Sequence, residues 1–277
     1  MNKNKESISI MGCGWLGLEV GKFLVTKGFD VKGSTTSKEK IAILKEAKIE
    51  PFLLKINEEI EASIADLQSF FSSSILLLNI PPGRRNPNVI EEHPKQIQKV
   101  IELAKKYGTE KVIFISSTGV YGDENKVMTE MDELNPVRTS AKALVKIEQN
   151  LKAEKSLKIN ILRFAGLIGG ERKAGRFFAG KKDIKGGNAR VNMVWRQDCI
   201  QVIHAIIEQD IWGEIFNVCA NEHPLKKDFY TQKAKEEGFE LPIFSEDAEA
   251  NFKIVSNEKV KRVLGVDFLS IQINHLK

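Results

Sequence analysis

The chain has 277 residues, 42% of them hydrophobic and 29% charged, and a formal net charge of +5. This length provides one large core, or a core and a smaller lobe, and the composition is that of an ordinary globular protein. The sequence starts with polar residues and has no apolar run of about 18 residues, so it predicts neither a signal peptide nor a membrane span, and we expect a cytoplasmic protein. The lysines are scattered along the chain, which predicts no nucleic-acid partner.

Predicted strands and helices alternate along the chain. Strands are expected at residues 7–11, 29–34, 52–55, 74–79, 111–116, 159–163 and 214–218. Helices are expected at residues 15–27, 38–48, 58–70, 88–107, 139–155 and 198–209. Short, continuously apolar runs such as 75–78 are typical of parallel strands that are covered on both faces. The chain therefore predicts an α/β fold with a doubly wound parallel sheet of the Rossmann type.

A glycine-rich loop follows the first predicted strand. Gly12, Gly14 and Gly17 have the G-x-G-x-x-G spacing of dinucleotide-binding turns. Glycine there permits a tight turn, a close approach of the pyrophosphate and close packing of the helix, whose first N–H groups meet the phosphates. A glycine-rich turn of some other α/β protein is the alternative. The predicted cofactor-binding residues of this loop are Gly12, Cys13, Gly14, Trp15, Leu16 and Gly17.

Two further groups of candidates lie where predicted strands end. Right-handed crossovers place the ligand crevice of a doubly wound sheet at the carboxyl ends of its strands. Asn79 and Pro81 follow the fourth strand, and Ser116 and Ser117 follow the fifth. We therefore predict that Asn79, Pro81 and Ser116 contact the cofactor. Arg84 and Arg85 come next to the fourth strand and could meet an anionic substrate, or they lie in a solvated loop.

The pattern becomes less regular after about residue 164. Residues 166–197 are rich in glycine, lysine and arginine, and the chain after residue 220 returns to short elements. We therefore expect a dinucleotide-binding domain at residues 1–163 plus 198–219. Residues 164–197 plus 220–277 are expected to form a small C-terminal lobe that binds the substrate.

Metal and disulfide chemistry have little support in the sequence. Cys13, Cys199 and Cys219 are odd in number, widely spaced and mostly in apolar surroundings, which predicts buried thiols. The four histidines show no ligand spacing, so we predict no metal site.

Four segments together resemble the extended and atypical short-chain dehydrogenase/reductases of the NAD-dependent epimerase/dehydratase family. They are the glycine loop, residues 114–122 (FISSTGVYG), residues 162–169 and residues 192–198, and the resemblance covers nearly the whole chain. The sequence GCGWLG at residues 12–17 is most similar to an atypical bacterial subgroup of this family. Trp195 stands where the family usually has a histidine. The resemblance implies NAD(P) binding, a small-molecule substrate and a homodimer formed through helices.

The end of the second strand decides which dinucleotide is preferred. The acidic position that binds the ribose of NAD in the family falls on Thr35, and no carboxylate follows before Glu39. Hydroxyl groups and a cation tolerate the 2′-phosphate instead, so Thr35, Thr36, Ser37 and Lys38 are predicted to bind NADP in preference to NAD. Thr36 and Ser37 could equally cap the next helix, and both roles are compatible.

The catalytic residues depart from the family pattern. Ser117 falls on the catalytic serine position, whereas the tyrosine and lysine positions of the Tyr-x-x-x-Lys pair fall on Ser140 and Leu144. The one Tyr-x-x-x-Lys match, from Tyr107 to Lys111, precedes the fifth strand and would lie at the wrong end of the sheet. A serine lacks the acidity of a phenol. We predict Ser117 and Tyr121 as the catalytic residues, with Tyr121 as the replacement acid/base.

Polar residues of the C-terminal half have two interpretations each. Arg163 and Arg172 flank a loop that lies near the cofactor in the family, and they either bind a substrate phosphate or are structural. Asp198 either closes the substrate site or stabilises the start of its helix, and we favour the helix role.

Three functions remain open on the sequence alone. The first is an NAD(P)-dependent oxidoreductase or epimerase/dehydratase that acts on a small carbonyl compound or sugar nucleotide. The second is a non-catalytic NAD(P)-binding redox sensor or regulator. The third is a binding or scaffold protein whose pocket has lost its chemistry. Cofactor binding separates the third from the others, and substrate turnover separates the first from the second.

Overall fold

The computed structural model describes residues 6–56, 60–83, 86–246 and 250–272. The chain divides into two compact units, which we call unit 1 and unit 2. Unit 1 comprises residues 1–117, 136–162 and 206–215, and unit 2 comprises residues 118–135, 163–205 and 216–277. Unit 2 therefore includes residues that the sequence assigns to the dinucleotide-binding domain, namely 118–135, 163, 198–205 and 216–219.

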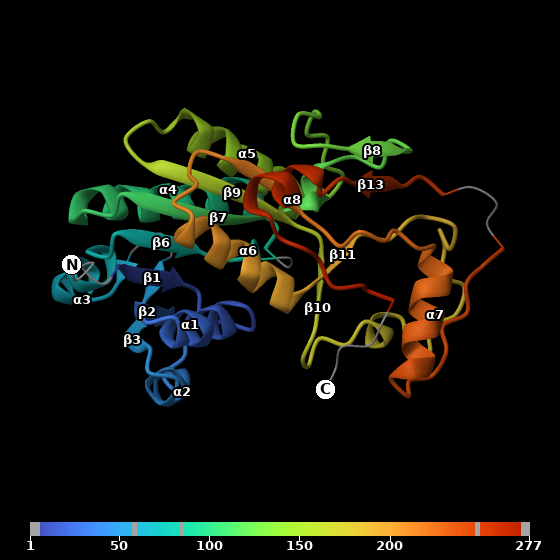
Figure 1. Ribbon diagram of the computed structural model, residues 1–277, viewed down its shortest axis with the longest axis horizontal. Coiled ribbons are helices and arrows are strands. Elements are labelled where there is room, and N and C mark those ends of the chain that lie inside the picture. Colours follow the sequence, from blue (N-terminus) through green and yellow to red (C-terminus); the bar gives the residue numbers. More distant parts are fainter. Residues whose placement is uncertain (1–5, 57–59, 84–85, 247–249, 273–277) are drawn as a thin grey trace. The chain divides into compact units, whose positions relative to one another are not determined.

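The helices and strands follow the expected alternation (Figure 1). In the first half of the chain they are β1 (Ser7–Met11), α1 (Gly17–Thr26), β2 (Asp30–Thr35), α2 (Lys40–Glu46), β3 (Glu50–Leu53), β4 (Lys55–Ile56), β5 (Ile60–Glu61), α3 (Ile64–Phe71), β6 (Ile75–Leu78), α4 (Val89–Tyr107), β7 (Lys111–Ser117), the 3-10 turn η1 (Thr118–Val120) and β8 (Lys126–Met128). In the second half they are α5 (Thr139–Ala153), β9 (Lys158–Phe164), β10 (Gly166–Ile168), η2 (Gly175–Phe177), β11 (Met193–Trp195), α6 (Arg196–Glu208), β12 (Ile215–Val218), α7 (Lys226–Glu236), β13 (Lys253–Val255) and α8 (Glu258–Leu264).

Seven strands form the central sheet, in the order β12-β9-β7-β6-β1-β2-β3. The pairs from β7 to β3 are parallel, and β1 lies between β2 and β6. The order reverses direction beside β1, which is where a doubly wound sheet binds its ligand. All seven predicted strands are present, and the predicted doubly wound parallel sheet is confirmed.

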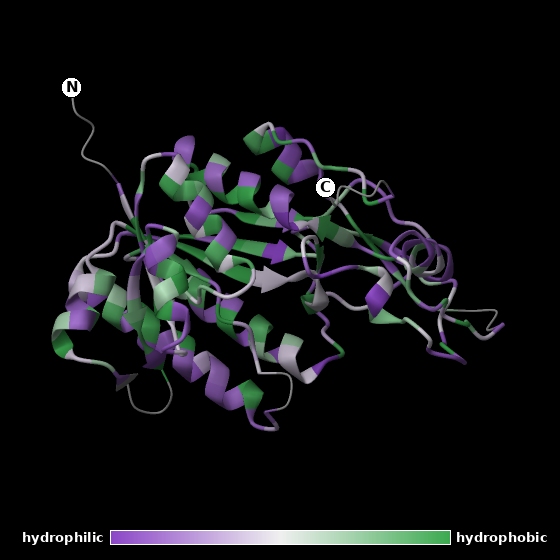
Figure 2. Cartoon of the chain, turned by 90° about the horizontal axis from the view of Figure 1, so that it is seen from below, coloured by the Kyte–Doolittle hydropathy of each residue, from purple (hydrophilic) through white to green (hydrophobic). Residues whose placement is uncertain are grey.

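The sheet is stabilised by burial on both faces. All four residues of β6 are fully buried, and the three central residues of β1 are also buried. Figure 2 shows hydrophobic strands in the middle of the sheet, with helices on both sides. Helix α1 packs on β1 and β2, while α4 packs against α5. Burying apolar side chains is the main favourable term in forming such a sheet. Among the described residues, no helix is long and apolar enough to cross a membrane.

One predicted helix begins later than the sequence suggests. A helix is expected from residue 58, but Ile60 and Glu61 form β5 and α3 begins at Ile64, while residues 58 and 59 lie outside the described part. The hydroxyl of Ser63 accepts the N–H of Asp66 at 3.0 Å and so caps the helix. The N-cap formed by Ser63, and not the apolar pattern, therefore sets the start of α3.

Unit 2 has a hydrophobic core of its own. Met193 and Trp195 of β11 pack with Phe229 and Tyr230 of α7 and with Ile271 near the end of the described chain. The indole N–H of Trp195 donates to the carbonyl of Ser270 at 3.0 Å, which fixes this last segment on the core.

Candidate functional site

The glycine loop between β1 and α1 is held by its backbone. Gly12 has a φ of +101°, and a Cβ atom there would lie 2.7 Å from the carbonyl oxygen of Asn79. The N–H of Gly12 donates to the hydroxyl of Ser34 at 2.9 Å, and its carbonyl accepts the Asn79 side-chain amide at 3.1 Å. Only glycine fits both this left-handed conformation and this close approach.

The other two glycines differ from each other in their surroundings. A Cβ atom at Gly17 would overlap the carbonyl oxygen of Gly12, so Gly17 lets α1 start directly against the loop. At Gly14, by contrast, a Cβ atom would meet no atom within 4 Å. The first N–H groups of a helix lack acceptors within the helix and bind phosphates. The open side of Gly14, before the N-terminus of α1, therefore fits the pyrophosphate of a dinucleotide.

The side chains of the loop are buried or half-buried. Cys13 and Leu16 are buried, and the thiol of Cys13 lies against Gly33, where a Cβ atom would come within 2.6 Å of the sulfur. The N–H of Cys13 donates to the carbonyl of Ser34 at 2.9 Å. Neither the thiol nor the backbone N–H of Cys13 is available to a ligand. Gly14 has no side chain and that of Leu16 is buried, so these two residues would bind a ligand through their backbone. Trp15 is half-buried.

The end of β2 presents some of its predicted residues but not all. Thr35 is buried and its hydroxyl accepts the N–H of Ser37 at 3.1 Å, which makes Thr35 part of the turn. Thr36 and Lys38 are exposed. The hydroxyl of Ser37 donates to the carboxylate of Glu39. Thr36 and Lys38 are thus the groups that could reach a 2′-phosphate.

The residues after β6 and β7 have different roles. Asn79 fixes Gly12, as described, and Pro81 is exposed. Ser116 is buried and donates to the carboxylate of Glu148 at 2.6 Å, so its hydroxyl joins β7 to α5. Ser117 is half-buried at the end of β7. Of these four residues, Pro81 is exposed, Asn79 and Ser117 are half-buried, and Ser116 is buried. Arg84 and Arg85 lie outside the described residues.

Two residues with structural roles were not among the predicted site residues. Ser34 positions the N–H of Gly12, and Glu148 accepts the hydroxyl of Ser116. For Ser34, the only signal in the sequence was its hydroxyl, one residue before Thr35, which was expected to contact the cofactor. Glu148 lies in an amphipathic helix, where a charged residue normally faces water, and no local pattern indicated its complete burial.

Helix α5 carries no phenol at the position of the missing tyrosine. Ser140 lies in its first turn and is half-buried, and Leu144 is buried. The chain's Tyr107 ends α4 and Lys111 begins β7, with the left-handed Gly108 between them. The pair therefore lies at the amino end of β7, as predicted, and away from Ser117 at its carboxyl end.

Tyr121 lies in a buried polar cluster of unit 2. Its side chain is 1% exposed, and its oxygen lies 2.9 Å from the Thr129 carbonyl and 2.8 Å from Oδ1 of Asn217. It also accepts an N–H of Arg163 at 2.6 Å. Burial raises the pKa of Tyr121 to about 12, although the guanidinium of Arg163 opposes this rise. The predicted acid/base role of Tyr121 stays a prediction, and its contacts favour a positioning role.

The two arginines considered for a substrate phosphate are placed differently. Arg163 is fully buried, and its guanidinium lies over the ring of Tyr121 at 5.1 Å from the centroid as well as bonding to its hydroxyl. Arg172 is exposed. The geometry therefore gives Arg163 a structural role.

Asp198 stabilises the start of α6 and the end of the described chain. Its carboxylate accepts the backbone N–H of Trp195, which precedes the helix, and that of Leu269 at 3.2 Å. The first contact is the helix-end role that the sequence favours. Burial raises the pKa of Asp198 to about 7.

Comparison with known proteins points to the same cofactor as the glycine loop. A family model described as NAD(P)H-binding matches residues 12–210. The chain is 31% identical to protein YeeZ of Escherichia coli (strain K12) over 264 residues, which cover 95% of this chain and 96% of that protein.

Solved structures with low sequence identity share the fold. A UDP-glucose 4-epimerase from Thermotoga maritima, solved with UDP-glucose, has a TM-score of 0.79 and 20% identity, covering 96% of this chain and 95% of that one. A short-chain dehydrogenase/reductase superfamily protein from Agrobacterium tumefaciens with bound NAD has a TM-score of 0.78 and 16% identity, covering 96% and 94%. These likenesses show an epimerase/dehydratase-like fold.

Proposed function

Because the chain belongs to the NAD(P)H-binding family, we propose that it is an NAD(P)-dependent oxidoreductase or epimerase/dehydratase that acts on a small carbonyl compound or a sugar nucleotide. The observation that carries this proposal is the open side of Gly14 in a loop that is otherwise closed by Gly12, Gly17, Ser34 and Asn79. The open side supports the proposal because it lies directly before the N-terminus of α1, where backbone N–H groups bind phosphates.

The dinucleotide would be held mainly by the backbone. The loop at Gly14 and the N-terminus of α1 would bind the pyrophosphate, and Thr36 and Lys38 would bind the 2′-phosphate of NADP. The exposed cation of Lys38 and the absence of a carboxylate at Thr35 support NADP over NAD. When bound, the nicotinamide supplies a hydride donor or acceptor.

Ser117 would hydrogen-bond the reacting oxygen of the substrate, since it is half-buried at the carboxyl end of β7. Tyr121 keeps its proton at neutral pH, because its pKa is raised to about 12. A general acid works best with a pKa near the operating pH, so the proton donor would need either a rearranged Tyr121 or a group of the substrate.

Isothermal calorimetry with NADPH, NADP, NADH and NAD, without substrate, tests the proposal. We expect micromolar binding of NADPH and NADP, and at least about tenfold weaker binding of NADH and NAD. A screen of UDP-sugars and small carbonyl compounds, followed by the absorbance of NADPH and by product analysis, then tests turnover. Absence of binding by all four dinucleotides would refute the proposal.

A non-catalytic redox sensor is the second candidate, and the contacts of Tyr121 favour it. Its hydroxyl is already bound by Arg163 and Asn217, and α5 has Ser140 where the family has its tyrosine. A sensor of this kind would bind reduced and oxidised dinucleotide with different affinities and show no turnover. Equal affinity for NADPH and NADP, together with turnover of any screened substrate, would exclude it.

A further inference from the structure

A cavity of about 500 Å³ lies in unit 1 at the amino ends of the strands. It is lined by the end of α5, the start of β9 and the turn before β12. The glycine loop follows the carboxyl end of β1, so the two places lie at opposite ends of a parallel sheet. Cavities of about 300 to 1,000 Å³ are typical of small-molecule sites.

The turn that borders this cavity is fixed in place. Asn160 is fully buried, and its side chain donates to the Ile211 carbonyl at 2.7 Å and accepts the N–H of Glu214 at 2.8 Å. Asp210 has a left-handed φ of 54°, which an L-residue rarely adopts, and the hydrogen bonds of Asn160 stabilise the turn that contains it. The turn is therefore preorganised in the absence of a ligand.

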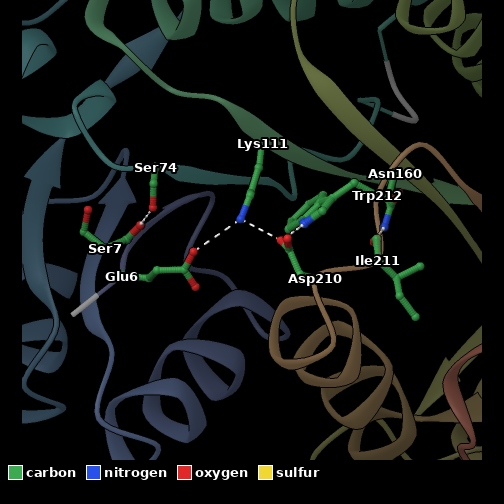
Figure 3. Close-up of polar contacts among 8 residues, drawn as sticks. All are labelled: Glu6, Ser7, Ser74, Lys111, Asn160, Asp210, Ile211 and Trp212. Carbon is green, nitrogen blue, oxygen red and sulfur yellow. Dashed lines mark hydrogen bonds and ion pairs between the residues drawn. The ribbon is translucent and has the colours of Figure 1, made fainter. Parts of the chain in front are cut away.

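The turn contributes Trp212 to the lining of the cavity. Trp212 lines the cavity, and its ring N–H donates to Asp210 at 2.6 Å (Figure 3). Lys111 reaches from β7 between Glu6 and Asp210, bonding Asp210 at 2.7 Å, and its ammonium lies 5.4 Å from the centroid of the indole. These contacts hold the ring of Trp212 in one orientation.

The lining of the cavity has an excess of positive charge. Of its two carboxylates, Glu154 pairs with Lys105 at 2.9 Å, and Asp210 shares Lys111 with Glu6. Its three lysines are Lys152, Lys155 and Lys158. All three are exposed. The ammonium of Lys155 donates to the carbonyl of Lys152 at 3.0 Å, and Lys158 contributes, after Lys111, to lowering the pKa of Asp210. The apolar lining comes from residues such as Leu157 and Ile159.

We propose that this cavity is a second ligand site, which binds an organic anion of the nucleoside phosphate class. The base stacks on the indole of Trp212, and the phosphates lie among Lys152, Lys155 and Lys158. Stacking on an aromatic side chain accepts any base, and lysine ammonium groups bind phosphate oxygens through charge-assisted hydrogen bonds. This site is separate from the dinucleotide loop and does not depend on the function proposed above.

The three tryptophans of the chain allow both sites to be followed in one experiment. Trp15 lies in the glycine loop, Trp212 lines the cavity, and Trp195 is buried in unit 2. Their indole N–H signals in a ¹⁵N NMR spectrum of the full chain are assigned with the three Trp→Phe variants and then followed during titration with ATP. We expect a saturable shift of the Trp212 signal. Adenosine alone and inorganic tripolyphosphate should each bind at least about tenfold more weakly than ATP.

Charge reversal provides the matched comparison. The variant Lys155→Glu/Lys158→Glu should weaken the binding of ATP at Trp212 about tenfold or more, whereas Lys45→Glu/Lys95→Glu, an equal change of charge at exposed positions outside the cavity, should not. The proposal would be overturned if only the Trp15 signal shifted, or if the shift of the Trp212 signal did not saturate. It would also be overturned if both variants weakened the binding of ATP equally. Tripolyphosphate binding as tightly as ATP would also overturn it, because the stacked base would then contribute nothing.

Discussion

The glycine loop of unit 1 and the Tyr121 cluster of unit 2 use polar groups in opposite ways. In the loop, Ser34 and Asn79 bind the backbone of Gly12 and leave the side at Gly14 open. In the cluster, Tyr121 and Arg163 bind each other and are fully buried. We infer that a polar residue near a strand end can belong to a binding site only when its protein partners leave room for a ligand.

Filling the open side of the loop should have the largest effect. Gly14→Val places a branched side chain where the pyrophosphate would lie, while no protein atom is near enough to be displaced. We expect the affinity for NADPH to fall about 1,000-fold or more, with little change in the free energy of unfolding. Calorimetry and urea denaturation measure the two quantities.

A matched glycine serves as the control for this variant. Gly17→Ala would bring a Cβ atom into the carbonyl of Gly12 and should reduce the stability as well as the binding. If Gly14→Val bound NADPH normally, the assignment of the loop would be wrong.

Removing one hydroxyl from the cluster should reduce stability next most strongly. Tyr121→Phe leaves the buried Arg163 and Asn217 short of a partner, and we expect the free energy of unfolding to fall by about 3 kcal/mol. Tyr107→Phe, a change of the same atoms at a half-buried residue, should cost less than about 0.5 kcal/mol. Equal losses in urea denaturation would contradict the structural role of the Tyr121 hydroxyl. With a substrate in hand, full activity of Tyr121→Phe would exclude Tyr121 as the acid/base.

The buried carboxyl of Asp198 should make unit 2 sensitive to pH. Burial raises its pKa from 3.8 to about 7, so the folded state binds the proton more tightly than the unfolded state does. Its contribution to the free energy of unfolding is thus fully present below pH 4 and is lost as the pH rises through about 7.

Asp198→Asn should remove most of this pH dependence. The whole shift corresponds to roughly 4 kcal/mol, but an amide accepts the N–H groups of Trp195 and Leu269 more weakly, so we expect a net gain of about 2 kcal/mol at pH 8. Urea denaturation of both proteins at pH 5 and pH 8 measures it. An unchanged difference between wild type and variant at the two pH values would show that Asp198 does not titrate in this range.

The smallest effect is expected at the end of β2. Lys38→Ala removes an exposed cation that would bind the 2′-phosphate, and the affinity for NADPH should fall about fivefold while that for NADH stays the same. Lys45→Ala is the control, because it removes the same charge from the last turn of α2, whereas Lys38 precedes this helix. An equal loss for both dinucleotides would assign Lys38 a general rather than a specific role.

The sequence predicted the sheet well because buried parallel strands are continuously apolar. All seven strands were found, with ends displaced by at most two residues, and the six expected helices are present. The late start of α3 was missed because the cap formed by Ser63 outweighed the apolar pattern. The C-terminal half was predicted less well, because its elements are short and pair across long sequence separations, as β8 does with β13.

The candidate site was predictable where backbone geometry decides it and less so where side chains do. The glycine spacing led directly to Gly12, Gly14 and Gly17. The burial of Tyr121, Thr35 and Ser116 depends on partners from distant segments, such as Asn217 and Glu148, which no local pattern reveals. The family resemblance gave the positions of these residues, but it could not show which hydroxyl groups were already bound.

All three thiols are buried, as the sequence predicts, and this has a consequence for how the protein meets oxidants. Burial raises the pKa of Cys13 and Cys219 to about 12 and that of Cys199 well above its ordinary value. The thiolate is the form that reacts with peroxides and with alkylating reagents such as iodoacetamide, and none of the three sulfurs supplies it at neutral pH. The three thiols of the folded protein are therefore expected to react slowly with such reagents, and reaction at the rate of a free cysteine would report unfolding.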